Sequence, residues 1–187
     1  MKSLLLACWL GLACASVSAA EVSGVFIDER ITMEDGATLA LNGAGLREKF
    51  WVDVYVGSLY LPGPTRDIAE ILSQPGPLRI QLDFIYKEVA REKLLESWRE
   101  GFENNRQGEI SASPQARIEQ FYALFDSSAL ARDQYRFDYL PGAGTRISKN
   151  QQELGVIPGE DFRNALVEIW LGNHPADKRL KKAMLGL

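Results

Sequence analysis

The stretch "GAGLREKFWVDVYVGSLYLP", residues 43–62, decides the fold and locates the candidate site. From residue 50 onward it is apolar on both faces, rich in valine and aromatic residues, and closed by Pro62, which predicts a central β-strand over residues 50–61. Arg47 stands just before it, behind a Gly-Ala-Gly segment that predicts a turn. Such an arginine is either a solvated strand end or a fixed positive charge at the mouth of an apolar space.

The residues on either side predict further strands. Asp35-Gly36 and Asn42-Gly43 both favour tight hairpin turns, because Asn, Asp and Gly tolerate positive φ. Downstream, residues 78–86 alternate between apolar and polar, as expected for a strand with one face in the core. Its core-facing row is Ile80, Leu82, Phe84 and Tyr86. A later hairpin is predicted around the turn "PGAG", with strands over residues 134–140 and 145–149.

Five segments have helical periodicity, over about residues 65–74, 87–104, 113–125, 162–172 and 176–185. Strands and helices do not alternate strictly along the chain, so a doubly wound parallel sheet is not expected. The sequence predicts an α+β fold in which a largely antiparallel sheet carries a layer of helices on one face.

Residues 1–20 have the pattern of a secretory signal peptide: a basic start at Lys2, a short apolar run, and small residues before Glu21. The apolar run is shorter than the about 20 residues that span a membrane. We therefore expect a single mature domain over residues 21–187, without a transmembrane segment, in the periplasm or secreted. A lipid anchor on Cys14 is the alternative, although the Gly-Leu-Ala before it matches a lipobox poorly.

The composition excludes several classes of function. Both cysteines, Cys8 and Cys14, lie in the leader, so the mature chain has no thiol nucleophile and no disulfide. Acidic residues outnumber basic ones by 25 to 21, so nucleic acid is not an expected partner. The single histidine, His174, is predicted to lie in a surface loop. No metal-spaced cluster or nucleophile motif is present, so we assign no metal, no cofactor and no catalytic residue.

Four residues remain as candidate ligand-binding residues: Arg47, Tyr55, Tyr86 and Lys93. Tyr86 ends a core-facing row and Tyr55 lies mid-strand, so each is expected to be buried with a hydroxyl that needs a partner. Lys93 follows Tyr86 by two helical turns and can return to the same side. A guanidinium with two phenols at one end of an apolar space would bind a carboxylate or phenolate. The alternative is that the tyrosines are ordinary amphipathic core residues.

These residues lie in segments that resemble a known family. "LNGAGLREKFWVDVYVGSLYLP", "LDFIYKEVAREKL" and "FRNALVEIWLGNHPADKRLKKAMLG" are similar to the bacterial branch of the chalcone isomerase-like proteins, and the resemblance covers essentially the whole mature chain. It implies an open-faced β-sandwich, with a ligand cleft between an antiparallel sheet and a layer of helices.

The resemblance also implies roles for the four candidates. In the plant enzymes an arginine, a tyrosine, a threonine and an asparagine serve ring closure, and their positions fall on Arg47, Tyr86, Tyr55 and Lys93. The last two therefore depart from the enzymes. Non-catalytic fatty-acid-binding relatives use an arginine and a tyrosine at the positions of Arg47 and Tyr55, and this chain carries that pair.

We therefore expect a non-catalytic binding protein that holds a small amphipathic carboxylate, such as a fatty acid, or an aromatic ligand. An intramolecular lyase or isomerase of the chalcone isomerase type is the first alternative. Haem binding, which would require His174 to face a pocket, is the second. The sequence identifies no protein partner.

Overall fold

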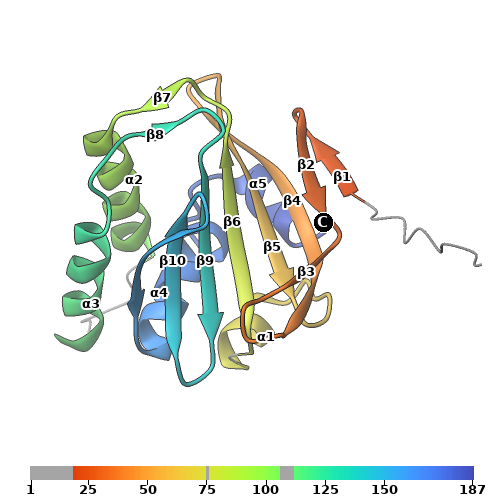
Figure 1. The fold of residues 1–187 in the computed structure, drawn as a ribbon, viewed down its shortest axis with the longest axis vertical. Coiled ribbons are helices and arrows are strands. Elements are labelled where there is room, and N and C mark those ends of the chain that lie inside the picture. The colour runs from red at the N-terminus through yellow and green to blue at the C-terminus, as the bar shows by residue number, and fades with distance from the viewer. Residues whose placement is uncertain (1–18, 75, 106–111) are drawn as a thin grey trace, which may run out of the picture.

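The computed structural model describes residues 19–74, 76–105 and 112–187. The predicted leader lies outside these residues except for Ala19 and Ala20, so its cleavage stays a prediction. The chain folds around a seven-stranded antiparallel sheet in the order β11-β10-β9-β6-β5-β4-β3, with two small two-stranded sheets beside it (Figure 1).

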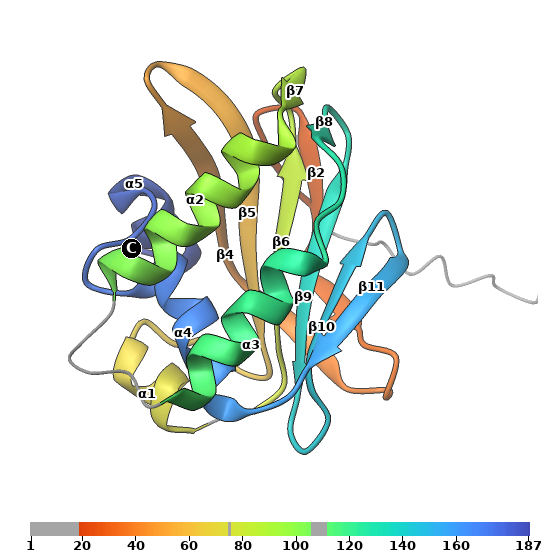
Figure 2. The same cartoon turned by 90° about the vertical axis from the view of Figure 1, so that its left-hand side faces the viewer.

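The elements follow one another in this order: β1 (Ala19–Val22), β2 (Val25–Asp28), β3 (Arg30–Thr32), β4 (Thr38–Lys49), β5 (Val52–Leu61), α1 (Ile68–Ser73), β6 (Leu78–Phe84), β7 (Glu88–Val89), α2 (Arg91–Asn104), α3 (Ala112–Ala123), β8 (Ala129–Leu130), β9 (Gln134–Leu140), β10 (Gly144–Lys149), β11 (Gln152–Ile157), α4 (Glu160–Leu171) and α5 (Lys178–Met184). The predicted α+β architecture is confirmed, because helices α2, α3 and α4 form a layer against one face of the sheet (Figure 2).

The main core lies between the sheet and this helical layer. Alternate residues of β5, β6 and β9 face the helices, and Trp98 of α2 sits among aromatic rings, with Phe137 5.9 Å and Trp170 5.7 Å away between ring centroids. Edge-to-face rings at these distances pack more favourably than their buried area alone implies. Aromatic side chains thus fill the space between sheet and helices.

The opposite face of the sheet is partly polar. Arg79 and Asp138, both buried, form a bidentate ion pair across β6 and β9 at 2.6 and 2.7 Å. Beside them a smaller apolar cluster joins Ile27 of the β1–β2 hairpin to Val56 and Tyr60 of β5. Side-chain alternation along each strand therefore separates an aromatic core face from a mixed face.

The predicted turn at Asn42-Gly43 is wrong, whereas the turn at Asp35-Gly36 is confirmed. Strand β4 runs through Asn42 and Gly43 with a register shift, and the chain reverses instead at Phe50-Trp51, where φ is +53° and +67°. Arg47 therefore lies inside β4, paired with Tyr55 of β5, and not at a strand entrance.

The helix predicted from residue 87 begins later, at Arg91, because residues 88 and 89 first form the short strand β7. Strand β11, which pairs with β10 at one edge of the main sheet, was not predicted.

The glycines of β4 and β5 serve close packing. Helix α5 lies over Gly43, Gly45 and Gly57, where the sheet presents no side chain. A Cβ on Gly45 would stand 2.5 Å from the Cβ of Ala183, and one on Gly43 would overlap the Ala183 carbonyl oxygen. The absence of side chains on the strands lets the helix backbone touch the sheet.

We expect Gly43→Ala to lower the free energy of unfolding by about 1–3 kcal/mol, because the new methyl group must push α5 off the sheet. Urea unfolding measures this change. Gly63→Ala is the matched control, since no atom lies within 4 Å of a Cβ at that position. Equal stability of the two variants would contradict the close packing of α5 on β4.

Candidate functional site

Arg47 and Tyr55 face each other on neighbouring strands. They are register partners of β4 and β5, and the guanidinium carbon of Arg47 lies 5.3 Å from the centroid of the Tyr55 ring. Arg47 is 8% exposed, its Nε has no hydrogen-bond partner, and it forms no ion pair within the part of the chain that the structure describes. A buried guanidinium without an anion is an unfavourable arrangement unless a ligand completes it.

Tyr55 is fixed from the helical layer. Its hydroxyl oxygen accepts a hydrogen bond of 2.8 Å from the Trp170 indole Nε1 of α4. Burial raises the pKa of Tyr55 above its usual value, although the positive charge of Arg47 opposes the shift. The phenol is therefore neutral at neutral pH, and its own O–H group stays available as a donor.

An open groove of about 800 Å³ begins at Arg47 and runs between the β4–β5 hairpin and α2. Its apolar lining comes from Phe50, Val52, Val54, Tyr86 and Val89. Charged side chains stand along the same groove: Lys49, Glu88, Lys93, Glu96 and Glu100. The groove thus combines one buried positive charge with an apolar wall and a rim of mixed charge.

Beneath the groove the interior is almost full. The inner cavity, which borders Arg47, Tyr55, Phe84 and Trp98, has a volume of only about 20 Å³. That volume is close to the space that a single water molecule needs. A ligand that reaches Arg47 must therefore leave most of its bulk in the outer groove.

The sequence predicted that Tyr86 points into the core, and this prediction is wrong. Strand β6 ends at Phe84, and the backbone N–H groups of Ile85 and Tyr86 both donate to the Val54 carbonyl, at 3.0 and 3.1 Å. The chain bends there, so the alternation that buried Phe84 no longer applies. Tyr86 is 43% exposed and lines the outer groove.

Lys93 also lies on the outer wall, with a side chain 72% exposed. Its Nζ forms an ion pair with Glu96 at 2.6 Å, and this bond raises the pKa of Lys93. The structure therefore brings Arg47 and Tyr55 into contact. Tyr86 and Lys93 line the same groove, but within the described residues they form no hydrogen bond or ion pair with Arg47 or Tyr55. The Lys93 ammonium already has an anionic partner in the Glu96 carboxylate.

Two features of the site were missed from sequence. Trp170 was assigned only to the buried stripe of its helix, yet its indole donates to Tyr55. A buried indole usually has an acceptor, and this tendency was the available signal, although the buried indole of Trp98 has none in the described part of the chain. Phe50 and Trp51 were counted into the buried strand, yet they are 85% and 93% exposed at the hairpin tip beside the groove.

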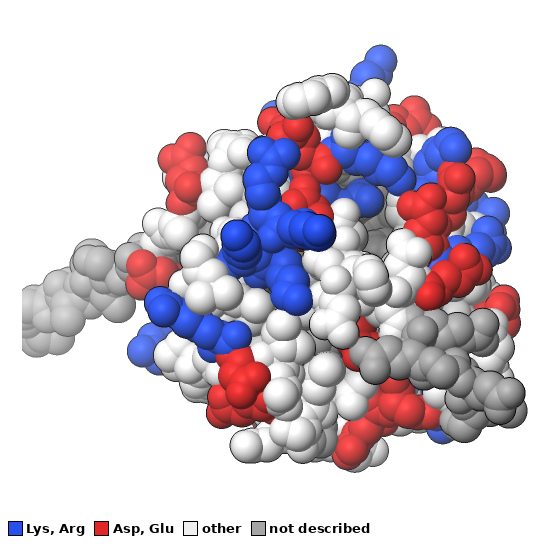
Figure 3. All heavy atoms as spheres, turned by 180° about the vertical axis from the view of Figure 1, so that it is seen from behind, with Lys and Arg blue, Asp and Glu red and all other residues white. Residues whose placement is uncertain are grey.

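Basic side chains gather on the face that carries α4 and α5 (Figure 3). Helix α5 contributes Lys178, Arg179, Lys181 and Lys182 to this face. The Nη2 of Arg179 lies 3.4 Å from Glu48 at the end of β4, so the helix borders the strand that carries Arg47.

The described residues contain no group of three or more His, Cys, Asp or Glu side chains that could hold a metal ion. His174 is exposed in the loop after α4, as predicted, and it does not border the groove. Among the helices in the described parts of the chain, none has the length and apolar character needed to cross a membrane.

A family model described as chalcone isomerase-like matches residues 19–186. Among solved structures, the fatty-acid binding protein AtFAP1 of Arabidopsis thaliana superposes with a TM-score of 0.64 at 14% identity, over 84% of this chain and 96% of that chain. At this identity the similarity shows a shared fold, and it confirms the architecture that the resemblance implied. No curated protein sequence matches the chain.

We expect Tyr55→Phe to lower the free energy of unfolding by about 1–3 kcal/mol, because the buried Trp170 N–H loses its acceptor. Urea unfolding followed by tryptophan fluorescence measures the change. Tyr86→Phe is the control and should shift stability by no more than about 0.5 kcal/mol, since that side chain is exposed. A neutral Tyr55→Phe would mean that Trp170 does not depend on the phenol.

Proposed function

This chain belongs to the chalcone isomerase-like family, and from that premise we propose that it binds a small amphipathic carboxylate, such as a fatty acid, without transforming it. The observation that carries the proposal is the Arg47 guanidinium, which is buried at the inner end of an apolar groove and has no ion-pair partner among the described residues. A protein of the same fold, AtFAP1, is a fatty-acid binding protein, and this similarity supports the proposal.

The carboxylate would take the place of the missing anion. A guanidinium offers two parallel N–H groups to a carboxylate, and such charge-assisted bonds are about twice as strong as neutral ones. Arg47 is nearly excluded from water, so less of this attraction is lost to solvent screening. The Tyr55 hydroxyl, neutral and fixed by Trp170, can donate a further hydrogen bond to the same ligand.

The apolar tail would lie along the groove between Val54 and Phe50. The groove volume of about 800 Å³ is within the usual range for small-molecule sites, about 300–1,000 Å³. The inner cavity of about 20 Å³ keeps the tail out of the core. One side of the tail therefore stays near solvent, and each added methylene should contribute less than the about 0.8 kcal/mol of full burial.

The same residues argue against ring closure as the function. Tyr55 occupies the position that the resemblance assigns to a small threonine, and its ring fills the space between Arg47 and Trp170. Lys93 stands where the enzymes carry an asparagine, and its ammonium is paired with Glu96 at the outer wall. Neither residue is placed to organise water around a closing ring. His174 lies outside the groove, so we propose no haem site.

We expect Arg47→Gln to weaken the binding of a long-chain fatty acid about 10- to 100-fold, the loss typical of a hydrogen bond to a charged group. Displacement of a fluorescent fatty acid measures the affinity. The methyl ester of the same acid should bind the wild-type protein about as weakly as the acid binds Arg47→Gln, because both changes remove one charge of the pair.

Lys93→Gln is the matched control, since it also removes a positive charge at the groove but leaves Arg47 intact; its affinity should stay within about threefold. Equal binding of acid and ester by the wild-type protein would overturn the proposal. A chalcone should lose its absorbance no faster with the protein than in buffer, and an acceleration that Arg47→Gln abolishes would support the isomerase instead.

We further propose that this binding takes place in the periplasm or outside the cell, on the basis of the leader pattern in residues 1–20. Intact-mass measurement of the protein exported from a bacterial host should show cleavage before Glu21 or one residue earlier. Retention of the leader would contradict export. A mass that includes lipid on Cys14 would show an anchored protein instead.

A further inference from the structure

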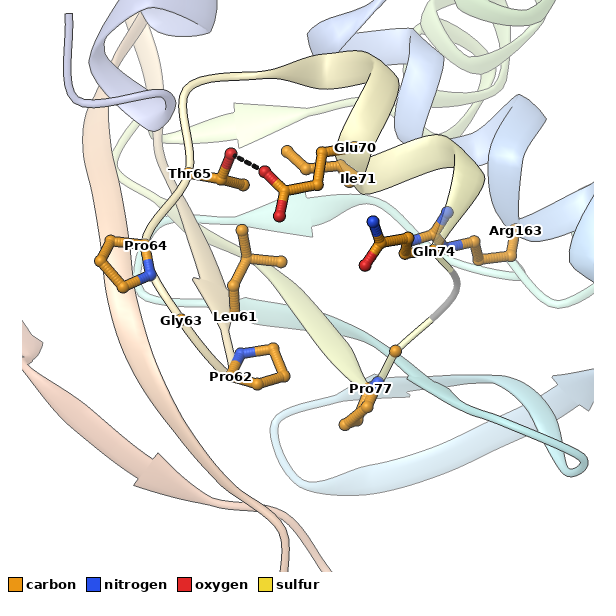
Figure 4. A pocket seen from close by; sticks show the side chains of 11 residues that line it. Leu61, Pro62, Gly63, Pro64, Thr65, Glu70, Ile71, Gln74, Pro77 and Arg163 are labelled. Atoms are coloured by element: carbon orange, nitrogen blue, oxygen red, sulfur yellow. Dashed lines mark hydrogen bonds between the residues drawn. The ribbon is translucent and has the colours of Figure 1, made fainter.

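A second cavity lies far from Arg47, at the opposite end of β5. It has a volume of about 440 Å³ and is formed by the end of β5, the β5–α1 connection, α1, Gly76 and Pro77 just before β6, and Arg163 of α4 (Figure 4). Arg47 pairs with Tyr55, and the cavity begins at Leu61, six residues further along β5, so the two sites are about 20 Å apart. Pro62, Pro64 and Pro77 line the cavity together with Leu61 and Ile71, and proline walls change shape little.

Arg163 forms one end of this cavity. It is 2% exposed, and its guanidinium lies over the ring of Tyr139 at 5.4 Å. Nη1 donates to Asn164 at 2.6 Å, whereas Nε has no partner and no ion pair to a carboxylate is formed in the described part of the chain. Burial lowers the pKa of Arg163, as expected for a cation whose charge is poorly compensated.

The other polar groups of the cavity come from α1 and the segment before it. The Glu70 carboxylate accepts a hydrogen bond of 2.5 Å from the Thr65 hydroxyl. The Gln74 side chain, which forms no hydrogen bond to any described residue, lies between Glu70 and Arg163 in Figure 4. The cavity therefore has a positive end, a negative end, an amide between them and apolar walls.

We propose that this cavity binds a small dipolar molecule of the amino-acid class, with its carboxylate on Arg163 and its ammonium on Glu70. The carboxylate supplies the anion that Arg163 lacks, in the bidentate manner that guanidinium favours. The ammonium can donate to the Glu70 oxygens, and Gln74 can bond to either end. A simple anion satisfies Arg163 but leaves Glu70 nearby as a repulsive charge, so the paired charges select a dipolar ligand.

The proposal is tested with glycine, β-alanine, γ-aminobutyrate and ε-aminocaproate on the full chain, with butyrate and butylamine as single-charge probes. Titrations followed by amide NMR shifts of Thr65 and Gln74 measure affinity and place the ligand. We expect one chain length of the series to bind about tenfold more tightly than butyrate or butylamine, because each charge of the ligand then has a partner. The preferred length reports the separation of the two charged groups.

Glu70→Gln should abolish this preference without weakening butyrate binding, since Arg163 and Gln74 are untouched and a charge that repels butyrate is removed. A Gln at this position can still accept from Thr65. Arg163→Gln should weaken butyrate as well; if that variant does not fold, the Glu70→Gln comparison still decides. Neither variant should alter fatty-acid binding at Arg47. Equal affinities for butyrate and the amino acids, or no binding by any of them at millimolar concentration, would overturn the proposal.

Discussion

The hydrogen bond from the Trp170 indole to the Tyr55 hydroxyl is the contact on which the Arg47 site depends. It ties helix α4 to the central strand β5 inside an otherwise apolar layer, where an unpaired indole or phenol would be costly. The bond orients the Tyr55 ring, and the ring in turn supports the Arg47 guanidinium from β4. These contacts join α4, β5 and β4, and they end at a buried positive charge that has no anionic partner among the described residues. The residues that stabilise this part of the core are therefore the ones that we propose to bind the ligand.

The sequence predicted correctly those helices and strands whose position depends only on the pattern of apolar and polar side chains. Alternation located β6 and β9, and the apolar stripe located α4, because these elements bury one face against the core. It failed at Gly43, since glycine serves either a turn or a close approach of backbone and only the position of α5 distinguishes the two. It failed again at Phe50-Trp51, where aromatic residues adopt the left-handed conformation that they rarely enter.

The candidate site also contains residues that the sequence placed correctly and residues that it misplaced. Arg47 and Tyr55 become partners through the register of the β4–β5 hairpin, and sequence reasoning grouped them even though it misplaced the turn. Tyr86 was assigned to the core by extending the alternation of β6 beyond Phe84. The assignment failed because alternation gives the direction of a side chain only while the strand continues, and β6 ends two residues before Tyr86. The Lys93–Glu96 pair was not predicted, although its i, i+3 spacing is a local signal, whereas the Trp170 contact joins residues 115 positions apart and needed the structure.

The glycine floor under α5 has a consequence for how a newly made chain reaches this fold. Asn42 of β4 bonds to the Met184 carbonyl, 142 residues later, so β4 and β5 leave the ribosome long before the helix that covers them. Closing so long a loop is slow relative to local hairpin formation. Until then the bare strip between Gly43 and Gly57 stays uncovered on the sheet. The contact that completes this part of the core is thus among the most distant along the chain, which places the docking of α5 on the sheet late in folding.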